Sequence, residues 1–422
     1  MSTQPTIKVT SMKDMVFEKG VGFLASLKDL PKHINTKTIT AGVVAAIFGC
    51  TGPALLVIKA ANDSGLTHAQ AISWLFSIYF FSGLISIFLA LRYKLPINGA
   101  YNIPAAVMLI DALKGLSINE AAGGYFIAGV IVLILGLSGL IGKIMKRIPL
   151  PIVMAMIAGA MIRFGTDIIK STQAAPIIGM AALFGYLVLP RIVKKIPPVL
   201  GALMLGIIAT ALTVGFKTSG IDFKFAGPQL IMPQFSLNSI FAIGIPLAVL
   251  VIGSENAQAI GVLMAQGYKP PINFMTIISG IGSMITSFFG GHNANIAGPM
   301  TAICASEEAG ENKEGRYAAT VVNGILFSLF GIFASIALAF VSILPKDLIN
   351  VLAGLAMINV LISTFHDAFS SKQFKIGAFF SLIIAMSGVV ILKISAPLWA
   401  LLGGVIVSYI AEPGDFKKAA SN

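Results

Sequence analysis

Long apolar blocks recur along this sequence from position 38 to position 411, each of about 17 to 25 residues, which is enough for one helix to cross a bilayer. Inside a bilayer every backbone polar group must be satisfied within the protein, so the blocks favour helices. Only 11% of the residues are charged, against about 25% in soluble domains. The sequence therefore predicts an all-α polytopic membrane protein.

We expect about fourteen transmembrane segments, some of them weakly marked. They lie near residues 38–58, 68–91, 97–113, 121–142, 150–165, 174–190, 198–215, 239–264, 272–288, 291–305, 317–342, 348–369, 374–392 and 396–411. The longest polar interval, 217–238, separates a first repeat at 38–216 from a second at 239–411. Residues 1–37 and 412–422 form the terminal segments.

The basic residues are distributed unevenly over the connecting loops. With alternating loops and the N-terminus inside, 21 lysines and arginines fall on the inner side and 8 on the outer side. This asymmetry follows the positive-inside rule and places both termini in the cytoplasm. The net charge of +12 is thereby explained by topology, and nucleic-acid binding is the poorer interpretation.

The N-terminal stretch 12–30 alternates apolar residues with lysines. This pattern is typical of an amphipathic helix on the inner membrane surface, and a disordered tail is the alternative. The first 36 residues contain neither an apolar core nor a small-residue cleavage site, so no signal peptide is predicted. We expect a bacterial cytoplasmic (inner) membrane protein.

The two halves of the chain resemble each other at corresponding places. In segments three and ten, INGAYNIPAAVMLI (97–110) aligns with GGHNANIAGPMTAI (290–303), which superimposes Asn102-Ile103 on Asn295-Ile296. Segments one and eight each carry a polar break inside apolar sequence, at 48–58 and 252–262. Because seven is odd, the second half must enter the membrane from the opposite side. The pattern predicts a 7+7 inverted repeat, an architecture common in secondary transporters.

Segments three and ten are the most interrupted. Their glycine-containing first parts suit extended strand, and the apolar runs that follow suit half-helices beginning inside the membrane. Asn102 and Asn295 precede these runs as N-caps, and Pro104 fits the first helical turn. Two helix N-termini that meet near the midplane present free N–H groups to one point, which favours an anion or a strong acceptor.

Glu255 stands inside an apolar run of segment eight. A carboxylate at the bilayer centre costs roughly 2.5–3.5 kcal/mol, so such residues usually face a cavity and act there. Burial disfavours the charged form, which would let Glu255 exchange a proton and admit an anionic substrate only when neutral. We therefore predict that Glu255 binds substrate and couples it to protons. A structural hydrogen bond to extended backbone is the alternative.

Other polar residues of these segments are candidates for the same site. His292 could contact substrate, relay protons or satisfy a carbonyl, and Tyr101 could stack on a flat substrate or simply pack. The predicted substrate-binding set is Glu255, His292, Asn293, Tyr101, Asn102, Asn295, Asn256, Thr51 and Gln258. His366 and Asp367 are interpreted as interfacial. Arg163 is interpreted as a snorkelling anchor.

Several function classes fit poorly. The chain lacks HExxH and GxSxG motifs and its four histidines are scattered, so no enzyme is predicted. Two cysteines, Cys50 and Cys304, are too few for a disulfide framework or a metal cluster. We expect no cofactor and no metal. A structural scaffold would not need broken polar segments in the membrane interior.

Three stretches resemble the benzoate:proton symporter family (BenE-type). They are IPLAVLVIGSENAQAIGVLMAQGY (245–268), TSFFGGHNANIAGPMTAICASEE (286–308) and RYKLPINGAYNIPAAVML (92–109). The likeness extends more loosely over residues 38–411. That family is similar in fold to uracil permease and the nucleobase–ascorbate transporters. The resemblance implies a core domain (38–142 plus 239–342) that moves against a gate domain (150–215 plus 348–411).

The resemblance also implies a function and partners. Substrate would bind between segments three and ten, and the gate domains could form a homodimer. The leading hypothesis is a proton-coupled importer of a small aromatic carboxylate such as benzoate. A carboxylate at position 255 also suits the N–H and C=O edge of a nucleobase, so a nucleobase permease is the first alternative. An anion channel or facilitator is the second, and sodium is the alternative coupling ion.

Overall fold

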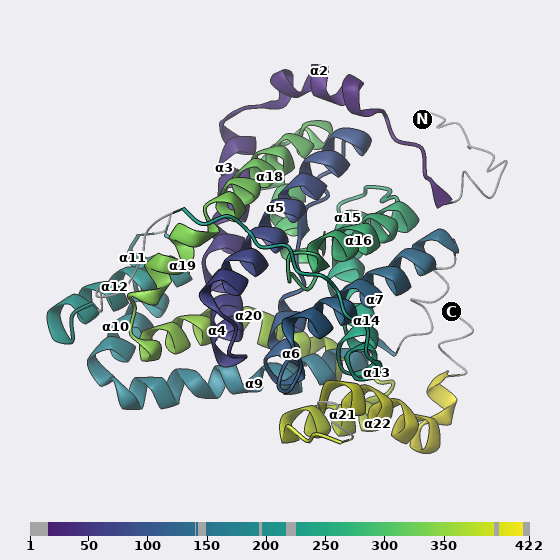
Figure 1. Ribbon diagram of the computed structural model, residues 1–422. Helices are drawn as coiled ribbons and strands as arrows, with labels where there is room; N and C mark the ends of the chain where they lie inside the picture. The colour runs from purple at the N-terminus through teal and green to yellow at the C-terminus, as the bar shows by residue number, and fades with distance from the viewer. Residues whose placement is uncertain are drawn as a thin grey trace.

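The computed structural model of the chain describes residues 16–139, 141, 149–193, 196–216, 225–391 and 396–416, apart from the side chains at positions 52, 265, 360 and 397. Helices dominate this part of the chain (Figure 1), and the described strands are two pairs of residues. The prediction of an all-α membrane protein is confirmed at this level.

The first half contains ten helices and one strand among the described residues. They are α2 (Phe23–His33), α3 (Thr36–Cys50), α4 (Gly52–Asp63), α5 (His68–Tyr93), β1 (Gly99–Ala100), α6 (Ile103–Ala112), α7 (Ile118–Leu137), α9 (Leu150–Ala174), α10 (Pro176–Leu187), α11 (Leu189–Ile192) and α12 (Pro198–Thr213). Thr51 separates α3 from α4, so the polar break predicted in segment one is a real interruption.

The second half opens with an irregular helical stretch. It comprises α13 (Leu237–Ser239), a π-helical turn (Ile240–Gly244), α14 (Ile245–Leu250), a second π-helical turn (Val251–Asn256) and α15 (Ala257–Ala265). The elements that follow are α16 (Ile272–Ser287), β2 (Asn295–Ile296), α17 (Gly298–Ala305), two 3₁₀ turns (Glu307–Ala309 and Lys313–Gly315), α18 (Tyr317–Ile332), α19 (Ala334–Ser342), α20 (Lys346–Phe369), α21 (Lys375–Ser387) and α22 (Ala396–Ala411).

Seven helical stretches among the described residues are long and apolar enough to cross a membrane. They are Thr36–Asp63, His68–Tyr93, Ile118–Leu137, Leu150–Ala174, Leu237–Met264, Lys313–Ile332 and Lys346–Phe369. Six shorter apolar helices accompany them. Each of the fourteen expected segments overlaps a helix or a strand–helix pair of the structure. That all of them cross the membrane stays a prediction.

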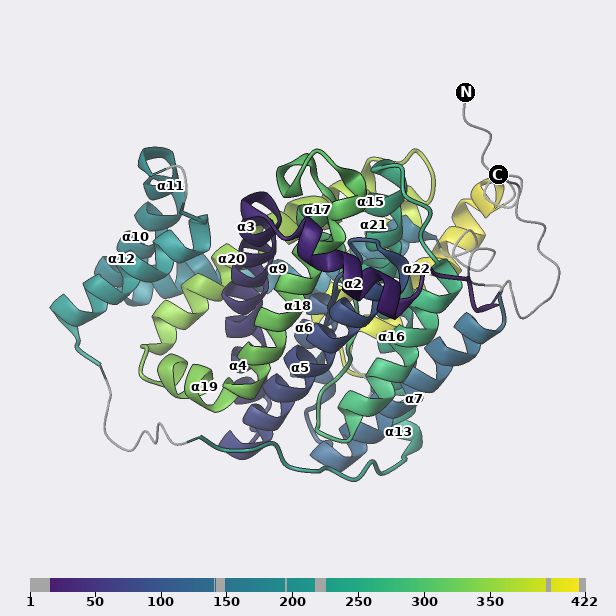
Figure 2. The same ribbon diagram turned by 90° about the horizontal axis from the view of Figure 1, so that it is seen from above.

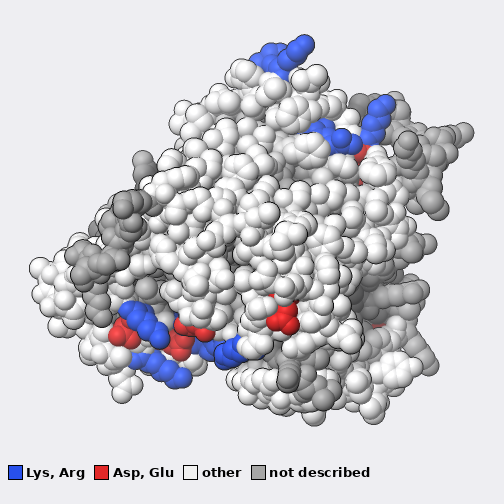
Figure 3. Space-filling view, in the orientation of Figure 1, with Lys and Arg blue, Asp and Glu red and all other residues white. Residues whose placement is uncertain are grey.

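Charged side chains avoid the middle of the molecule on the face shown in Figure 3. They gather near α2 at the top and at the lower left, around α9 and the lower end of α4, with a broad uncharged band between. At the lower end Asp111 pairs with Lys114 and Arg163 at 2.8 and 2.9 Å. At the upper end Lys94 pairs with Asp29. This banding is what a bilayer requires, because charge inside hydrocarbon is costly.

The helix predicted within residues 12–30 is interrupted in the described part of the chain. Residues 17–22 are not helical, α2 begins at Phe23, and residues 12–15 lie outside the described part. Figure 1 shows α2 lying across the upper ends of α5 and α18. The Tyr317 hydroxyl donates to the Ser26 carbonyl at 3.0 Å, whereas Leu24 is 71% exposed on the opposite face. The helix is thus amphipathic, and hydrogen bonds hold its inner face to the bundle.

The helices pack in two sets. In one, α5 packs against α18, α18 against α3, and α7 against α16. In the other, α9 packs against α20 and α21, α21 against α22, and α10 against α12. In Figure 2 the α10–α12 unit extends to one side of the molecule. Contacts of α20 with α4 and of α9 with α6 join the two sets.

The connection between the halves is extended where it is described. Residues 225–236 run along one end of the bundle towards α13 (Figure 2). The Ile231 N–H donates to the Phe288 carbonyl at 2.7 Å, and the Gln234 N–H donates to the Asn119 carbonyl at 2.8 Å. These bonds satisfy backbone groups that have no helical partner and fix the start of the second half.

Candidate functional site

Segments three and ten meet inside the bundle as a short antiparallel pair. Gly99 is opposite Ile296, and Ala100 is opposite Asn295. All four residues are buried. The two strands exchange backbone hydrogen bonds that neither could form alone in a membrane interior. The prediction that these segments are extended first and helical afterwards is confirmed.

A half-helix follows each strand. Helix α6 begins with Ile103-Pro104 and α17 with Gly298-Pro299, so both place proline in the first turn, where no N–H is needed. Asn102 caps α6, because its side-chain oxygen accepts from the Ala105 N–H at 2.9 Å. The cap predicted at Asn295 is wrong. Residue Ala297 occupies the N-cap position of α17, and Asn295 belongs to the strand.

Glu255 closes the start of α17. It lies on the second π-helical turn, is 5% exposed, and its Oε2 accepts from the Gly298 N–H at 3.1 Å. π-helical turns recur at functional sites because the extra residue redirects side chains. A carboxylate at a helix N-terminus also meets the positive end of the helix dipole. The structural alternative for Glu255, a bond to backbone beside the extended strand, is therefore present in this conformation.

His292 joins both interrupted segments to α5. The Trp74 Nε1–H donates to His292 Nδ1 at 2.9 Å, which leaves Nε2 to donate to the Asn102 carbonyl at 3.0 Å. In return the Asn102 N–H donates to Asn293 Oδ1 at 2.9 Å. These bonds are fully buried and link the two chain segments on both sides of Asn102. They rigidify the strand crossing that presents the two helix starts.

Tyr101 belongs to a second buried chain of hydrogen bonds. Its hydroxyl lies 2.7 Å from that of Tyr79, and the Tyr79 hydroxyl donates to the Gly49 carbonyl at 2.7 Å. Gly49 is in the last turn of α3, just before the break at Thr51. The chain therefore ties the broken first segment to segment three. The Tyr101 ring packs edge-on against His292, with centroids 5.8 Å apart.

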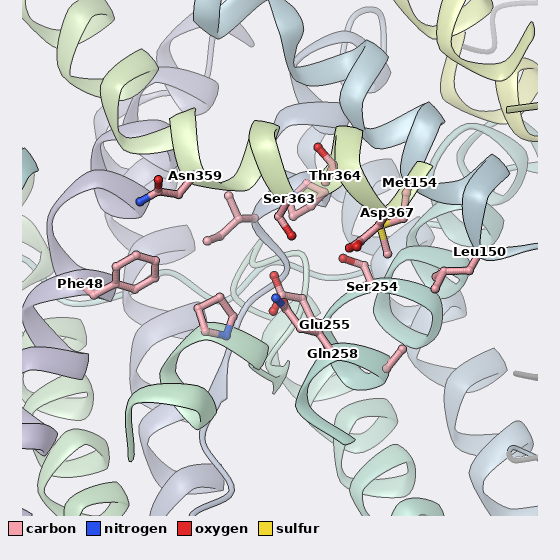
Figure 4. A pocket seen from close by; sticks show the side chains of 14 residues that line it. Phe48, Leu150, Met154, Ser254, Glu255, Gln258, Asn359, Ser363, Thr364 and Asp367 are labelled. Atoms are coloured by element: carbon pink, nitrogen blue, oxygen red, sulfur yellow. The ribbon is translucent and has the colours of Figure 1, made fainter. Parts of the chain in front are cut away.

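A cavity of about 360 Å³ opens beside Glu255. Segment eight, the starts of α6 and α17, α9 and α20 surround it (Figure 4). Its lining residues are Phe48, Ile103, Pro104, Leu150, Met154, Ser254, Glu255, Ala257, Gln258, Pro299, Asn359, Ser363, Thr364 and Asp367. Apolar side chains, two helix N-termini and a few polar groups therefore face one space, which is the usual composition of a small-molecule site.

Two of the nine predicted site residues line this cavity, namely Glu255 and Gln258. The other seven do not. Tyr101, Asn102, His292, Asn293 and Asn295 lie in the strand crossing behind it. Thr51 donates to the Ile47 carbonyl at 2.7 Å, and Asn256 accepts from the Ser279 hydroxyl at 3.2 Å. Direct contact of these seven with substrate stays a prediction. In this conformation their hydrogen bonds support the wall of the cavity.

Asp367, which the sequence analysis interprets as interfacial, also lines the cavity opposite Glu255, and its position at the membrane interface stays a prediction. The residues Asn359, Ser363 and Asp367 are spaced by four along α20 and line the same space. Polar residues at i, i+4 and i+8 share one face of an apolar helix, and this pattern in the sequence could have identified them as cavity-lining residues. His366, beside Asp367, is mostly exposed, and its Nδ1 lies 3.3 Å from Asp367 Oδ1.

Arg163 is not a free snorkelling anchor. Its guanidinium donates to Asp111 Oδ2 at 2.9 Å and to the Val107 carbonyl at 3.0 Å. Both acceptors belong to α6, and the carbonyl lies in its last turns. The contact therefore joins α9 to the half-helix that begins at the cavity. Among the described residues no cluster of His, Cys, Asp and Glu is arranged to hold a metal ion.

The two asparagines of the crossing give a matched test of this geometry. We expect Asn102→Ala to destabilise the protein by about 1–3 kcal/mol, since it removes the α6 cap and the bond from Nδ2 to the Leu250 carbonyl. Asn295→Ala removes a side chain without a hydrogen-bond partner in the structure, so its cost should be smaller. Thermal unfolding in detergent measures both. Equal or reversed costs would contradict the assignment of the cap.

The fold defines a class of protein. The structure resembles the transmembrane domain of the cyanobacterial bicarbonate transporter BicA, with a TM-score of 0.59 at 17% identity over 88% of this chain and 97% of that one. It also resembles the overall structure of SLC26A9, with a TM-score of 0.59 at 15% identity over 97% of this chain and 72% of that one. At these identities the likeness concerns the fold, which is that of polytopic α-helical transporters.

The sequence is more specific. Residues 32–410 match the BenE family, described as benzoate membrane transport protein, and the chain belongs to this family of membrane transporters. It is 28% identical to the benzoate membrane transport protein of Acinetobacter baylyi, over 91% of this chain and 97% of that protein. It is 29% identical to the inner membrane protein YdcO of Escherichia coli, over 90% of this chain and 98% of that protein. The chain is a transporter and not an enzyme.

Proposed function

We propose that the chain is a proton-coupled secondary transporter that imports a small aromatic carboxylate such as benzoate. The observation that carries the proposal is the position of Glu255, which lines the cavity while it accepts the first N–H of α17. This N–H, at the positive end of a half-helix, is where the carboxylate of a substrate would bind. The name of the Acinetobacter relative and the family description support the same substrate class.

Competition for one N–H group accounts for the coupling. Ionised Glu255 occupies the Gly298 N–H and repels a substrate carboxylate. Protonated Glu255 is a weaker acceptor and carries no charge, so the substrate anion can take the N–H. One proton on Glu255 therefore accompanies one anion, and the loaded site gains no net charge. This neutrality lowers the cost of moving the site through the membrane interior.

The rest of the cavity suits an aromatic ring. Phe48, Ile103 and Met154 face the cavity, and Pro104 and Pro299 cover the two helix starts. An apolar wall next to an anion-binding end matches a molecule with a flat apolar body and one carboxylate. A nucleobase, which carries N–H and C=O groups around its whole edge, would leave several of those groups against apolar side chains.

The transport cycle that we propose is alternating access. The fourteen segments form a 7+7 inverted repeat with both termini in the cytoplasm, in a bacterial inner membrane, as for the Escherichia coli relative. The core domain (38–142 plus 239–342) moves against the gate domain (150–215 plus 348–411). In the proposed orientation Leu150 and Asp367, which line the cavity, are at inner ends of α9 and α20, so this conformation is inward-facing. Two copies form a homodimer through the gate domains.

We expect proteoliposomes that contain the purified chain to accumulate labelled benzoate when an inward proton gradient is imposed. Collapse of the gradient with a protonophore should reduce uptake to equilibration. A parallel experiment with a sodium gradient at constant pH tests whether sodium is the coupling ion instead of the proton. Unlabelled benzoate should compete, and uracil or a purine should not.

Other outcomes would identify the alternatives. Competition by nucleobases and not by benzoate would assign a nucleobase permease. Benzoate flux that equilibrates but never accumulates under any gradient would assign a facilitator or channel. Accumulation driven by sodium alone would replace the proton in the scheme. Each result would contradict the proposal at a different step.

A further inference from the structure

The cavity has a second acid that the coupling scheme does not use. Asp367 extends from α20 into the same space as Glu255, which extends from segment eight (Figure 4). The two carboxyl groups differ in access to water, because the Glu255 residue is 5% exposed and the Asp367 side chain is 43% exposed. Glu255 is therefore at the enclosed end of the cavity, and Asp367 is at its more exposed mouth.

Hydroxyl groups lie on the walls between and beside these acids. Ser254 precedes Glu255 on the π-helical turn, and Ser363 lies one helical turn before Asp367 on α20. Both line the cavity, and in Figure 4 the hydroxyls of Ser254 and Ser363 point into it along with the two carboxyl groups. A hydroxyl both donates and accepts a hydrogen bond, so it can pass a proton between two acids, either directly or through one water.

Few other ionisable groups surround Asp367 among the described residues. On its own helix His366 lies beside it, with Nδ1 at 3.3 Å from Asp367 Oδ1. From segment eight the facing acid is Glu255. From α9 the lining residues are Leu150 and Met154, which do not titrate. Asp367 therefore has no lysine or arginine partner among the described residues that line the cavity.

We propose that Asp367 is the proton-release group of the transporter. This inference rests on the proposed function, since it assigns the exit of the proton that Glu255 carries. In the inward-facing conformation the Glu255 carboxylic acid gives its proton to the Asp367 carboxylate through a cavity hydroxyl or water. The substrate anion dissociates, and Glu255, now a carboxylate, takes back the Gly298 N–H and prevents the anion from rebinding. Asp367 then releases the proton to water at the mouth, assisted by His366.

The location of Asp367 gives it a second property. It is on α20, in the proposed gate domain, whereas Glu255 is in the proposed core domain. Relative motion of the two domains would separate the acids, and the proton path would exist only while the cavity is open to the mouth. Proton release would thus be confined to one side of the membrane, as symport requires.

The test compares two transport modes of the full chain in proteoliposomes. Net uptake driven by an inward proton gradient requires proton release in every cycle. Equilibrium exchange of labelled for unlabelled benzoate at one pH does not, because the loaded carrier returns still protonated. The variants are Asp367→Asn, Asp367→Glu and Asp347→Asn. Asp347 is in the first turn of the same helix and does not line the cavity, so it is the matched control.

We expect Asp367→Asn to slow net uptake by roughly 10²-fold, the lower range for loss of a positioned proton-transfer group. Equilibrium exchange should fall far less than net uptake. Asp367→Glu should restore net uptake with an altered pH profile, and Asp347→Asn should match the wild type in both modes. Asparagine has nearly the size of aspartate, and thermal unfolding confirms that each variant is folded.

Two results would overturn the inference while leaving the proposed function intact. Net uptake by Asp367→Asn at the wild-type rate would show that protons leave by another path. Equal loss of net uptake and exchange in a folded Asp367→Asn protein would assign Asp367 to substrate binding or structure. Failure of the wild type to respond to a proton gradient is a different result, which would reject the proposed function and this inference together.

Discussion

Replacing Glu255 with glutamine is expected to abolish the accumulation of benzoate that a proton gradient drives. Glutamine retains an oxygen that can accept the Gly298 N–H and has nearly the same size, so the fold should survive. It cannot exchange a proton and resembles protonated glutamate permanently. Gradient-driven uptake should fall by about 10²-fold or more, the range for loss of a proton-transfer group, whereas downhill flux should persist without a response to the gradient.

The measurement is uptake in proteoliposomes at several imposed pH differences. Glu308→Gln is the matched control, because it makes the same substitution at an exposed acid remote from the cavity lining. The phenotype also separates the two acids. Glu255→Gln should lose the response to the gradient, whereas Asp367→Asn should retain the response and lose speed. Gradient-driven accumulation by Glu255→Gln at the wild-type rate would contradict the coupling scheme.

Substitution of Gly282, which lies behind the strand crossing, should affect the protein as strongly as substitution of Glu255 in front of it. A Cβ atom at Gly282 of α16 would lie 2.3 Å from the Ala294 carbonyl oxygen and 2.8 Å from Ile85 Cδ1. The first contact is with backbone, so β2 would have to move away from α16. We expect Gly282→Ala to destabilise the protein by about 1–3 kcal/mol or more, as overpacking does, and to impair transport through displacement of β2.

The control is a helical glycine with space around it. A Cβ atom at Gly261 of α15 would meet nothing within 4 Å, so Gly261→Ala should leave stability unchanged or raise it by up to about 1 kcal/mol through helix propensity. Thermal unfolding in detergent compares the two variants. The packing of α16 against β2 would be wrong if Gly282→Ala melted at or above the wild-type temperature.

The sequence predicted the positions of the helices well, because hydrophobic length is a direct physical requirement of the bilayer. It also predicted the strand–helix form of segments three and ten. The polar, glycine-containing run 288–299 could not continue a helix, and its location inside apolar sequence required a partner for its backbone. The ungapped match of Asn102 with Asn295 did not align the two strands with each other, because it places β1 (Gly99–Ala100) on residues 292–293 and β2 (Asn295–Ile296) on residues 102–103.

Finer features depended on contacts that no local pattern contains. Asn102 and Asn295 occupy equivalent places in the alignment, yet only Asn102 caps a helix, because α17 begins three residues after Asn295. Hydrophobic periodicity could not reveal the π-helical turn that directs Glu255 towards Gly298. Asp367 was interpreted as interfacial because it is near the predicted inner end of segment twelve. Its place in the cavity depends on how α9 packs against both α20 and the π-helical turn of segment eight.

The strand pair has a consequence for how the protein is made. Gly99 and Ala100 emerge from the ribosome almost two hundred residues before their partners Ile296 and Asn295. Until then their peptide groups have no hydrogen-bond partner in the bilayer, so they must be hydrated or shielded by the translocation machinery. The nascent first half should thus stay exposed to membrane proteases and chaperones until translation passes α17. Biogenesis, and not only transport, then requires both halves on one chain or in close synchrony.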